Sequence, residues 1–167
     1  NFGIIYGITE FGLAPEIKGT VQEAKRMLNG WFERYKGADK FIKMCRNTHL
    51  RNQILTNCFG RKKRVGLVAR GNLDFLRNEA ANFQPQSIAS DITLTAGINT
   101  WEQLRDWDCR IVNTVHDSII YERPIREDII VDTAERHRAI MLVKNELERI
   151  PKLYDIDQVP FIADAEH

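Results

Sequence analysis

The sequence predicts an α+β fold, in which helices and antiparallel hairpins share a core without alternating regularly. Apolar residues recur every three or four positions over residues 20–35 and again over 126–150, which is the spacing of amphipathic helices. Between them, residues 110–122 place two β-rich runs on either side of a polar pair, a pattern typical of a hairpin. Because no strand–helix–strand alternation is present, a parallel sheet is disfavoured. With 167 residues, 43% of them hydrophobic, the chain is large enough to bury a core.

The first third of the chain is predicted to be helical. Residues 1–7 are apolar and end in glycine, as at the end of a helix. Thr20 and Glu23 have the spacing of a capping box, in which each side chain satisfies a backbone N–H at a helix start. A helix over about 20–35 is therefore expected, followed by a second helix over about 38–51.

The rest of the chain mixes hairpins with helices. Residues 53–68 are expected to form a hairpin around a glycine turn, with the apolar part of its second arm beginning at Val65. Two helical stretches are expected next, over about 72–81 and 87–99. After the 110–122 hairpin and the long helix over 126–150, residues 159–163 are expected to form a final strand.

Charge is distributed unevenly along the chain, although the net charge is only +1. Residues 34–70 contain eleven Lys or Arg and a single acid, Asp39, whereas residues 122–167 contain eleven acids and seven bases. A basic middle and an acidic end indicate an anionic partner held at one place. A solvated helix face is the alternative explanation for the basic stretch.

Three cysteines and the hydropathy pattern exclude several protein classes. Cys45, Cys58 and Cys109 are odd in number and lack a Cys-x-x-Cys spacing, so neither a disulfide framework nor a zinc site is indicated. A reducing, cytoplasmic setting is expected. No apolar run approaches the ~18 residues of a spanning helix, so no membrane association is expected. The first residue is Asn and no signal-peptide pattern follows, so we expect a piece of a longer or processed polypeptide.

The acid at the tip of the 110–122 hairpin is the first candidate for chemistry. A carboxylate on a tight turn is rigid and exposed, which suits Asp117 to bind a hard cation such as Mg²⁺ through oxygen. Aspartate also simply favours turns, and the spacing alone leaves both explanations open. His116, beside it, is on the same evidence more typical of a structural hydrogen-bonding residue.

Four motifs, in order, resemble family A of the DNA polymerases, the bacterial DNA polymerase I type. Residues 1–7 (Asn-Phe-Gly-Ile-Ile-Tyr-Gly) and 12–14 (Gly-Leu-Ala) resemble the end of motif B, the fingers helix. Residues 56–62 resemble the Thr-x-x-Gly-Arg-Arg hairpin of that family, and residues 82–91 resemble its Asn-x-x-x-Gln segment. Residues 115–117 (Val-His-Asp) resemble motif C. The order and approximate spacing hold almost to the end of the chain.

The resemblance implies part of a right-hand polymerase fold, with a fingers portion at 1–53 and a palm portion at 54–167. It implies template-directed, two-metal nucleotidyl transfer from a dNTP to a primer 3′-hydroxyl. Asp117 would be the catalytic carboxylate that binds Mg²⁺, and His116 would lie near the primer terminus. Ser118 departs from the family, in which a second acid is common here, and a neutral hydroxyl supplies no charge to a metal.

Two aromatic residues and a glycine would bind the incoming nucleotide and the template. Phe2 and Tyr6 lie four residues apart and hence on one helical face. By resemblance they lie beside the nascent base pair and sugar, and Phe2 in place of Tyr implies discrimination against dideoxynucleotides. Gly7 would allow close approach of the template. An apolar stripe that packs into the core is the alternative for the aromatic pair.

Five polar residues would contact primer–template DNA. Side-chain amides of Asn82 and Gln86 can meet minor-groove acceptors that every base pair presents, although helix capping also explains them. Arg77 is one residue out of register with an Arg that the family often carries. Arg61 and Lys62 begin the densest basic cluster, which would bind phosphates in a salt-dependent way or simply be solvated.

The resemblance also implies which parts of a polymerase active site are not among these 167 residues. The first metal-binding Asp, in motif A, and the fingers residues that hold the triphosphate lie upstream in the family, so the second protein carboxylate would come from elsewhere. We therefore expect no polymerisation without an N-terminal polymerase portion or subunit, in a bacterial cell or a phage-infected host. A non-catalytic nucleic-acid-binding or scaffold module is the alternative, which Ser118 and the displaced Arg77 favour.

Overall fold

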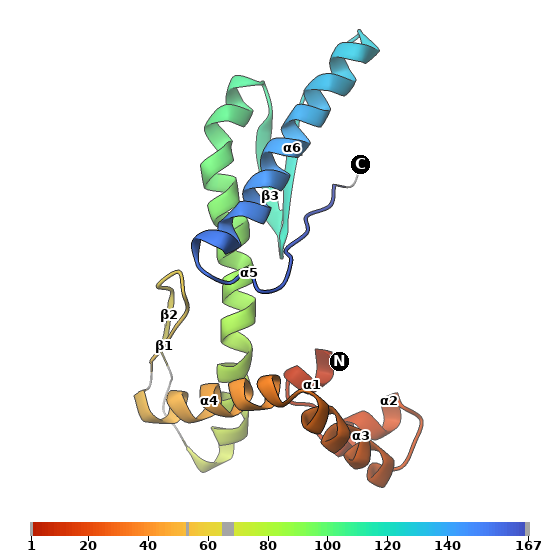
Figure 1. Ribbon diagram of the computed structural model, residues 1–167, viewed down its shortest axis with the longest axis vertical. Helices are drawn as coiled ribbons and strands as arrows, with labels where there is room; N and C mark the ends of the chain where they lie inside the picture. Colours follow the sequence, from red (N-terminus) through yellow and green to blue (C-terminus); the bar gives the residue numbers. More distant parts are fainter. Residues whose placement is uncertain (1, 53, 65–68, 166–167) are drawn as a thin grey trace. The chain divides into compact units, whose positions relative to one another are not determined.

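The computed structural model describes residues 2–52, 54–64 and 69–165, and the chain divides into two compact units, Asn1–Gln86 and Ser87–His167. Helices and two small antiparallel sheets make up these units, which confirms the predicted α+β class (Figure 1). The expected division into a fingers portion at 1–53 and a palm portion at 54–167 is a different division from these two compact units. It stays a prediction.

The first unit begins with four helices, α1 (Phe2–Ile5), α2 (Glu10–Glu16), α3 (Val21–Arg34) and α4 (Lys36–Asn52). The predicted capping box starts α3, since the Thr20 hydroxyl accepts from the Glu23 N–H at 3.2 Å and the Glu23 carboxylate accepts from the Thr20 N–H at 2.8 Å. The helix expected at 38–51 is confirmed as α4, which is slightly longer at both ends.

A short basic hairpin follows, with β1 (Ile54–Thr56) paired antiparallel to β2 (Lys62–Arg64). Its turn contains Gly60 at a φ of 84°, and the Asn57 carboxamide oxygen accepts from two backbone N–H groups of the loop. The predicted hairpin around Gly60 is therefore confirmed. The apolar arm expected from Val65 onward lies outside the described residues, and the described second strand consists of basic residues.

One long helix replaces the two that were expected at 72–81 and 87–99. After a 3₁₀ turn, η1 (Arg70–Asn72), the helix α5 (Leu73–Asp106) runs for 34 residues, so the expectation of two stretches was wrong. Pro85 inside it removes one backbone donor, which usually interrupts a helix. The helix nevertheless continues through Pro85 to Asp106. Its small residues Ala80, Ala81 and Ala96 are fully buried.

The second unit is built around the predicted hairpin at 110–122. Strand β3 (Arg110–Val115) pairs antiparallel with β4 (Ser118–Glu122), and the long helix α6 (Ile129–Leu153) follows. Figure 1 shows the hairpin between the C-terminal half of α5 and α6. The core consists of Leu104, Cys109, Ala139 and Val143, against which inward residues of both strands pack.

The C-terminal part of the chain differs from the prediction in the bounds of its helix, which ends three residues later than expected, and in its last segment. Helix α6 begins three residues later than expected, because the Asp128 carboxylate accepts from the N–H groups of the first turn and caps it there. Residues 159–163 form no strand, so that expectation was wrong. The backbone of Ala163 is bonded instead by side chains of α6, with Lys144 donating to its carbonyl at 2.6 Å and Glu148 accepting from its N–H at 3.1 Å.

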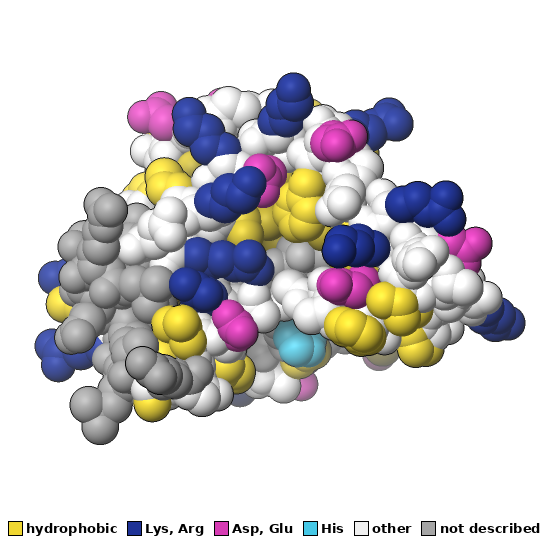
Figure 2. All heavy atoms as spheres, turned by 90° about the horizontal axis from the view of Figure 1, so that it is seen from below, with side chains coloured by type: hydrophobic (Ala, Val, Ile, Leu, Met, Phe, Trp, Pro, Cys, Tyr) yellow, Lys and Arg dark blue, Asp and Glu magenta, His cyan; other side chains and the backbone are white. Residues whose placement is uncertain are grey.

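The surface carries both signs of charge. On the face drawn in Figure 2, Lys and Arg side chains are interspersed with acidic and hydrophobic ones and do not form one continuous basic sheet. Attraction of an anion to this face therefore depends on local clusters rather than on a uniform field. Within 2–52, 54–64 and 69–165, no helix has the length and apolar character needed to cross a membrane.

We expect Thr20→Ala to lower the free energy of unfolding by about 1 kcal/mol, because it removes the cap of α3. Thr20→Ser keeps the hydroxyl and should remain close to the unchanged protein. Chemical denaturation followed by far-ultraviolet circular dichroism measures the difference. Equal stability of all three proteins would contradict a contribution from the capping box.

Candidate active site

The tip of the β3–β4 hairpin is a two-residue turn that consists of His116 and Asp117. Val115 pairs with Ser118, so the two residues between them form the turn beyond the last pair of the ladder. His116 has a φ of 54°, in the left-handed region, which costs a non-glycine residue roughly 1–2 kcal/mol. Strain of this kind is often found at functional sites.

Both side chains of this turn are exposed to solvent. No hydrogen bond or ion pair joins either of them to another side chain within the described ranges. The Asp117 carboxylate is therefore accessible to a ligand from solution and is not engaged in a structural contact of its own. An exposed carboxylate of this kind is what a cation-binding site needs.

A cavity of about 1000 Å³ lies beside the turn, within the second unit. Asp117 and Ser118 line it from the hairpin, Arg136 and Lys144 from α6, and Phe161 from the C-terminal segment. With Arg123 and Asp164, which also line it, the cavity presents both cations and carboxylates to a ligand. Such a mixture of charges suits a ligand that carries negative charge together with a bound cation.

The described residues do not by themselves complete a metal site. Over residues 2–52, 54–64 and 69–165, no three His, Cys, Asp or Glu side chains lie close enough together to hold an ion. Asp117 fits as one oxygen ligand, whereas Mg²⁺ requires near-octahedral coordination by several oxygens. A second protein carboxylate from outside this chain stays a prediction.

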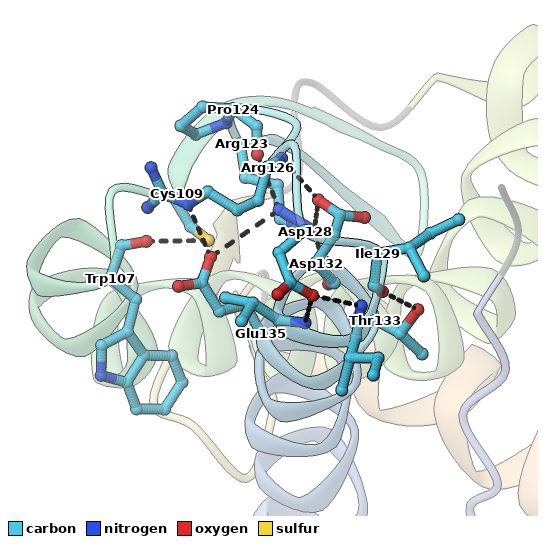
Figure 3. A network of polar contacts seen from close by, with 12 residues as sticks. Trp107, Cys109, Arg123, Pro124, Arg126, Asp128, Ile129, Asp132, Thr133 and Glu135 are labelled. Atoms are coloured by element: carbon cyan, nitrogen blue, oxygen red, sulfur yellow. Dashed lines mark hydrogen bonds and ion pairs between the residues drawn. The ribbon is translucent and has the colours of Figure 1, made fainter.

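An ionic network anchors the base of the hairpin to the start of α6, as Figure 3 shows. The Arg123 guanidinium donates to the Asp132 carboxylate and, at 2.7 Å, to the Asp132 carbonyl. Arg126 donates from its backbone N–H to the same carboxylate at 2.9 Å and from its side chain to Glu135 at 2.9 Å. The backbone N–H of Arg126, and then the charge of Arg123, lower the pKa of Asp132.

This network was missed by sequence reasoning. The signal was present, because two arginines three apart flank the start of the helix predicted over 126–150, and acids three apart follow at 132 and 135. Nearby, the Arg138 guanidinium lies 3.9 Å from the centre of the Trp107 ring, a cation–π contact. Burial raises the pKa of the Cys109 thiol, which packs in the same core.

In the first unit, two of the predicted ligand-binding residues meet. The Gln86 amide donates to the Tyr6 hydroxyl at 3.1 Å, although 80 positions separate them in the sequence. Tyr6 lies in the turn after α1 and is 42% exposed, so it is not a core residue. The backbone of Phe2 belongs to α1, and its side chain lies outside the described residues.

Gly7 has a structural requirement of its own. Its φ is 85°, and a β-carbon built on it would overlap the side-chain oxygen of Asn78. Helix α5 therefore packs directly against the turn that carries Tyr6, and only glycine fits between them. This close approach explains Gly7 without a template, so its predicted role at the template stays a prediction.

The predicted DNA-binding cations lie on two elements of the first unit. Arg61 and Lys62 are exposed at the β1–β2 hairpin, and Lys63 ties that hairpin to α5 through an ion pair with Glu79 at 2.7 Å. Arg77, on α5, pairs with Asp74 at 3.3 Å. Ion pairs on an exposed surface contribute at most about 1 kcal/mol to stability. Lys63 and Arg77 could therefore each exchange their carboxylate for another anionic partner.

Position 78, four residues before Asn82, is contacted by an arginine from another helix. Arg46 of α4 donates from its Nη2 to the Asn78 side-chain oxygen at 2.7 Å. One turn further along α5, the Asn82 side-chain oxygen is buried without a hydrogen-bond partner in the described part of the chain. Arg46 was missed, although it adjoins Cys45 and follows Ile42 by four, at the border of the buried stripe of α4.

Comparison with known proteins identifies the family. The family model described as DNA polymerase family A matches residues 1–165. The chain belongs to DNA polymerase family A. Similar proteins include DNA polymerase I of Caldicellulosiruptor bescii, 29% identical over 170 residues that cover 99% of this chain and 19% of that protein. DNA polymerase I of Lactococcus lactis subsp. lactis is 34% identical over 132 residues, 76% of this chain and 15% of that protein.

A solved structure has the same fold. The POL domain of Pol1 from M. smegmatis, in complex with DNA primer-template and dNTP, superposes with a TM-score of 0.76 at 24% identity. The match covers 89% of this chain and 26% of that one. The chain thus spans about a fifth of the length of the first family A relative named above.

We expect Gly7→Ala to destabilise the protein by about 1–2 kcal/mol, because alanine is strained at this left-handed φ and its methyl group would overlap Asn78. Gly30→Ala is the matched control, since Gly30 lies in α3 with nothing within 4 Å of a built β-carbon. That change should stabilise by roughly 0.5–1 kcal/mol. Denaturant unfolding compares the two, and equal effects would contradict the packing inferred at Gly7.

The lowered pKa of Asp132 predicts a pH dependence of stability. A carboxylate whose pKa is depressed on folding stabilises the protein above its ordinary value of 3.8 and loses this effect as the pH falls through the lower folded-state value. Asp132→Asn keeps an acceptor oxygen but loses the charge, so its melting temperature should fall below that of the unchanged protein at pH 7.

The melting temperatures of the two proteins should converge only below the lowered folded-state pKa of Asp132, where the natural side chain also becomes neutral. Asp157→Asn, at an exposed position away from the network, controls for the loss of one negative charge. A deficit of Asp132→Asn that stays constant from pH 7 down to about pH 2, where carboxylates are neutral, would contradict an ionic role for this carboxylate.

Proposed function

We propose that this chain forms the C-terminal part of a template-directed DNA polymerase active site, which transfers a nucleotidyl group from a dNTP to a primer 3′-hydroxyl. One observation carries this proposal: in a chain of family A, a carboxylate stands exposed at the tip of a two-residue β-turn, without a bond to any described side chain. A polymerase needs an acid at such a place, because primer, triphosphate and cation must all reach it from solution.

The hairpin tip supplies the groups nearest the chemistry. Asp117 would provide one carboxylate ligand, and His116 would contact the primer terminus. Mg²⁺ ions, when bound, would supply Lewis-acid activation of the hydroxyl and charge stabilisation for the pyrophosphate. Ser118 contributes no charge, so the remaining acidic ligand must come from motif A of an N-terminal polymerase portion or subunit.

The turn after α1 would hold the nascent base pair. The rings of Phe2 and Tyr6 would contact the incoming nucleotide, because stacking tolerates every base. The hydrogen bond from Gln86 to Tyr6 supports a shared site, since it links the predicted nucleotide contact to the predicted minor-groove contact at 3.1 Å. Gly7 would keep the backbone of the turn close to the template.

Primer–template DNA would lie along the amide-bearing face of α5 and the basic hairpin. Asn82 and Gln86 would donate to minor-groove acceptors, which checks base-pair geometry without reading sequence. Arg61, Lys62 and Arg77 would neutralise phosphates, and this contribution to affinity falls as salt rises. The relative from M. smegmatis was solved in complex with DNA primer-template and dNTP, which supports both ligands for this chain.

A second candidate function is a non-catalytic DNA-binding or scaffold module. Two observations favour it: the neutral Ser118 follows Asp117 in place of a second acid, and Arg77 is one position out of register with the arginine expected before Asn82. The two candidates differ in one measurable property, because a scaffold would bind primer–template duplex without extending the primer.

We expect Asp117→Asn to abolish primer extension while leaving duplex binding nearly unchanged. Loss of a metal-binding carboxylate removes several kcal/mol of transition-state stabilisation, which corresponds to about a 1000-fold lower rate or more. The assay uses the protein from its complete natural reading frame, or this chain supplemented with the upstream polymerase portion. Single-turnover extension and a gel shift, both with the same labelled primer–template, measure the two properties.

Glu122→Gln is the matched control, because it removes an exposed carboxylate at the other end of the same hairpin. It should extend the primer normally. Normal extension by Asp117→Asn would overturn the assignment of this residue. Duplex binding without extension, even by the unchanged and complete protein, would favour the scaffold function.

A further inference from the structure

Arg46 is a cation that has no carboxylate partner among the described residues, and it lies between two helices of the first unit. Its side chain is partly buried, and it donates from Nη2 to the neutral Asn78 amide at 2.7 Å. Its Nε is buried and has no acceptor in the described part of the chain. A guanidinium that served only to join α4 to α5 would be expected to have an acidic partner, because an uncompensated charge is costly to bury.

The neighbouring positions on α5 extend this polar site. Asn78, Asn82 and Gln86 follow one another at intervals of four, so their side chains share one face of the helix. The buried oxygen of Asn82 is also unsatisfied among the described residues, while Gln86 reaches Tyr6. The row therefore consists of neutral amides with the Arg46 guanidinium at one end.

The unpaired groups indicate the chemistry of the missing ligand. A buried polar atom without a partner is unfavourable, and a ligand that enters beside it can complete its hydrogen bonds. Arg46 requires an acceptor, whereas side-chain amides both donate and accept. A nucleic-acid strand offers both kinds of group along one line, since it carries acceptors on base edges and phosphates as well as base amino groups.

We propose that Arg46 is a DNA-binding residue, which donates from its guanidinium to an acceptor of the primer–template duplex at the Asn78 end of the amide row. This inference rests on the proposed function and adds to it a contact from α4, a helix that none of the motifs includes. Asn78 acts as the positioning partner, because its side-chain oxygen orients the guanidinium.

The acceptor belongs either to a phosphate or to the edge of a base, and two measurements distinguish them. Loss of one phosphate contact makes the slope of log affinity against log salt shallower by about 0.9. A contact to a purine N3 leaves that slope unchanged, and it is lost when the duplex carries a 3-deazapurine, which lacks that nitrogen.

The experiment compares the complete protein with Arg46→Met and Lys25→Met, each of which loses one positive charge. Lys25 is exposed on α3, outside the basic stretch at 34–70. Binding of a fluorescent primer–template is followed by anisotropy over a potassium chloride series, at a temperature where circular dichroism shows every variant folded. Duplexes with natural purines and with 3-deazapurines at the primer terminus are compared.

We expect Arg46→Met to weaken binding roughly 10-fold or more, as for a hydrogen bond to a charged group, and Lys25→Met to change it less than about 2-fold. A shallower salt slope for Arg46→Met identifies a phosphate as the acceptor. Loss of the 3-deazapurine effect in Arg46→Met identifies a purine N3. Equal binding by Arg46→Met and Lys25→Met, with the unchanged protein binding well, overturns the role of Arg46 alone. Failure of the unchanged protein to bind duplex at low salt overturns the proposed function as well.

Discussion

The register of the β3–β4 ladder is the constraint on which the candidate catalytic turn depends. Because side chains alternate along a strand, a slip of one residue would exchange the inward and outward faces. In the observed register, Ile111, Ile119 and Tyr121 pack on the core of the second unit, and Asp117 is left at the tip. The ionic network at the other end of the hairpin opposes such a slip by tying Arg123 to α6.

The arginines of this chain differ in the partners that they contact. Arg123 and Arg126 are paired with Asp132 and Glu135, so their charges are compensated and serve the fold. Within the described part of the chain, Arg46 meets a neutral amide instead of an acid, which leaves its charge available to a ligand. An arginine that is paired with an acid is thus a structural residue, whereas an arginine that contacts only a neutral amide is a candidate for binding a ligand.

Local signals predicted much of the fold, and non-local ones explain the failures. The capping box and both hairpins were predicted because the residues that decide them are close in sequence. The continuity of α5 through Pro85 was not predicted, since proline usually interrupts a helix and no local pattern shows where it is tolerated. Residues 159–163 looked like a strand, but the backbone partners of Ala163 are Lys144 and Glu148 of α6 rather than another strand.

The sequence by itself determined the family, the hairpin and the acid at its tip, because ordered motifs and the residues of a short turn can be recognised from neighbouring positions in the sequence. Only the tertiary structure decided which distant residues meet: Gln86 with Tyr6, Asn78 with Gly7, and Arg46 with Asn78. These contacts depend on how helices pack, and packing is set by the whole set of buried side chains rather than by any local pattern.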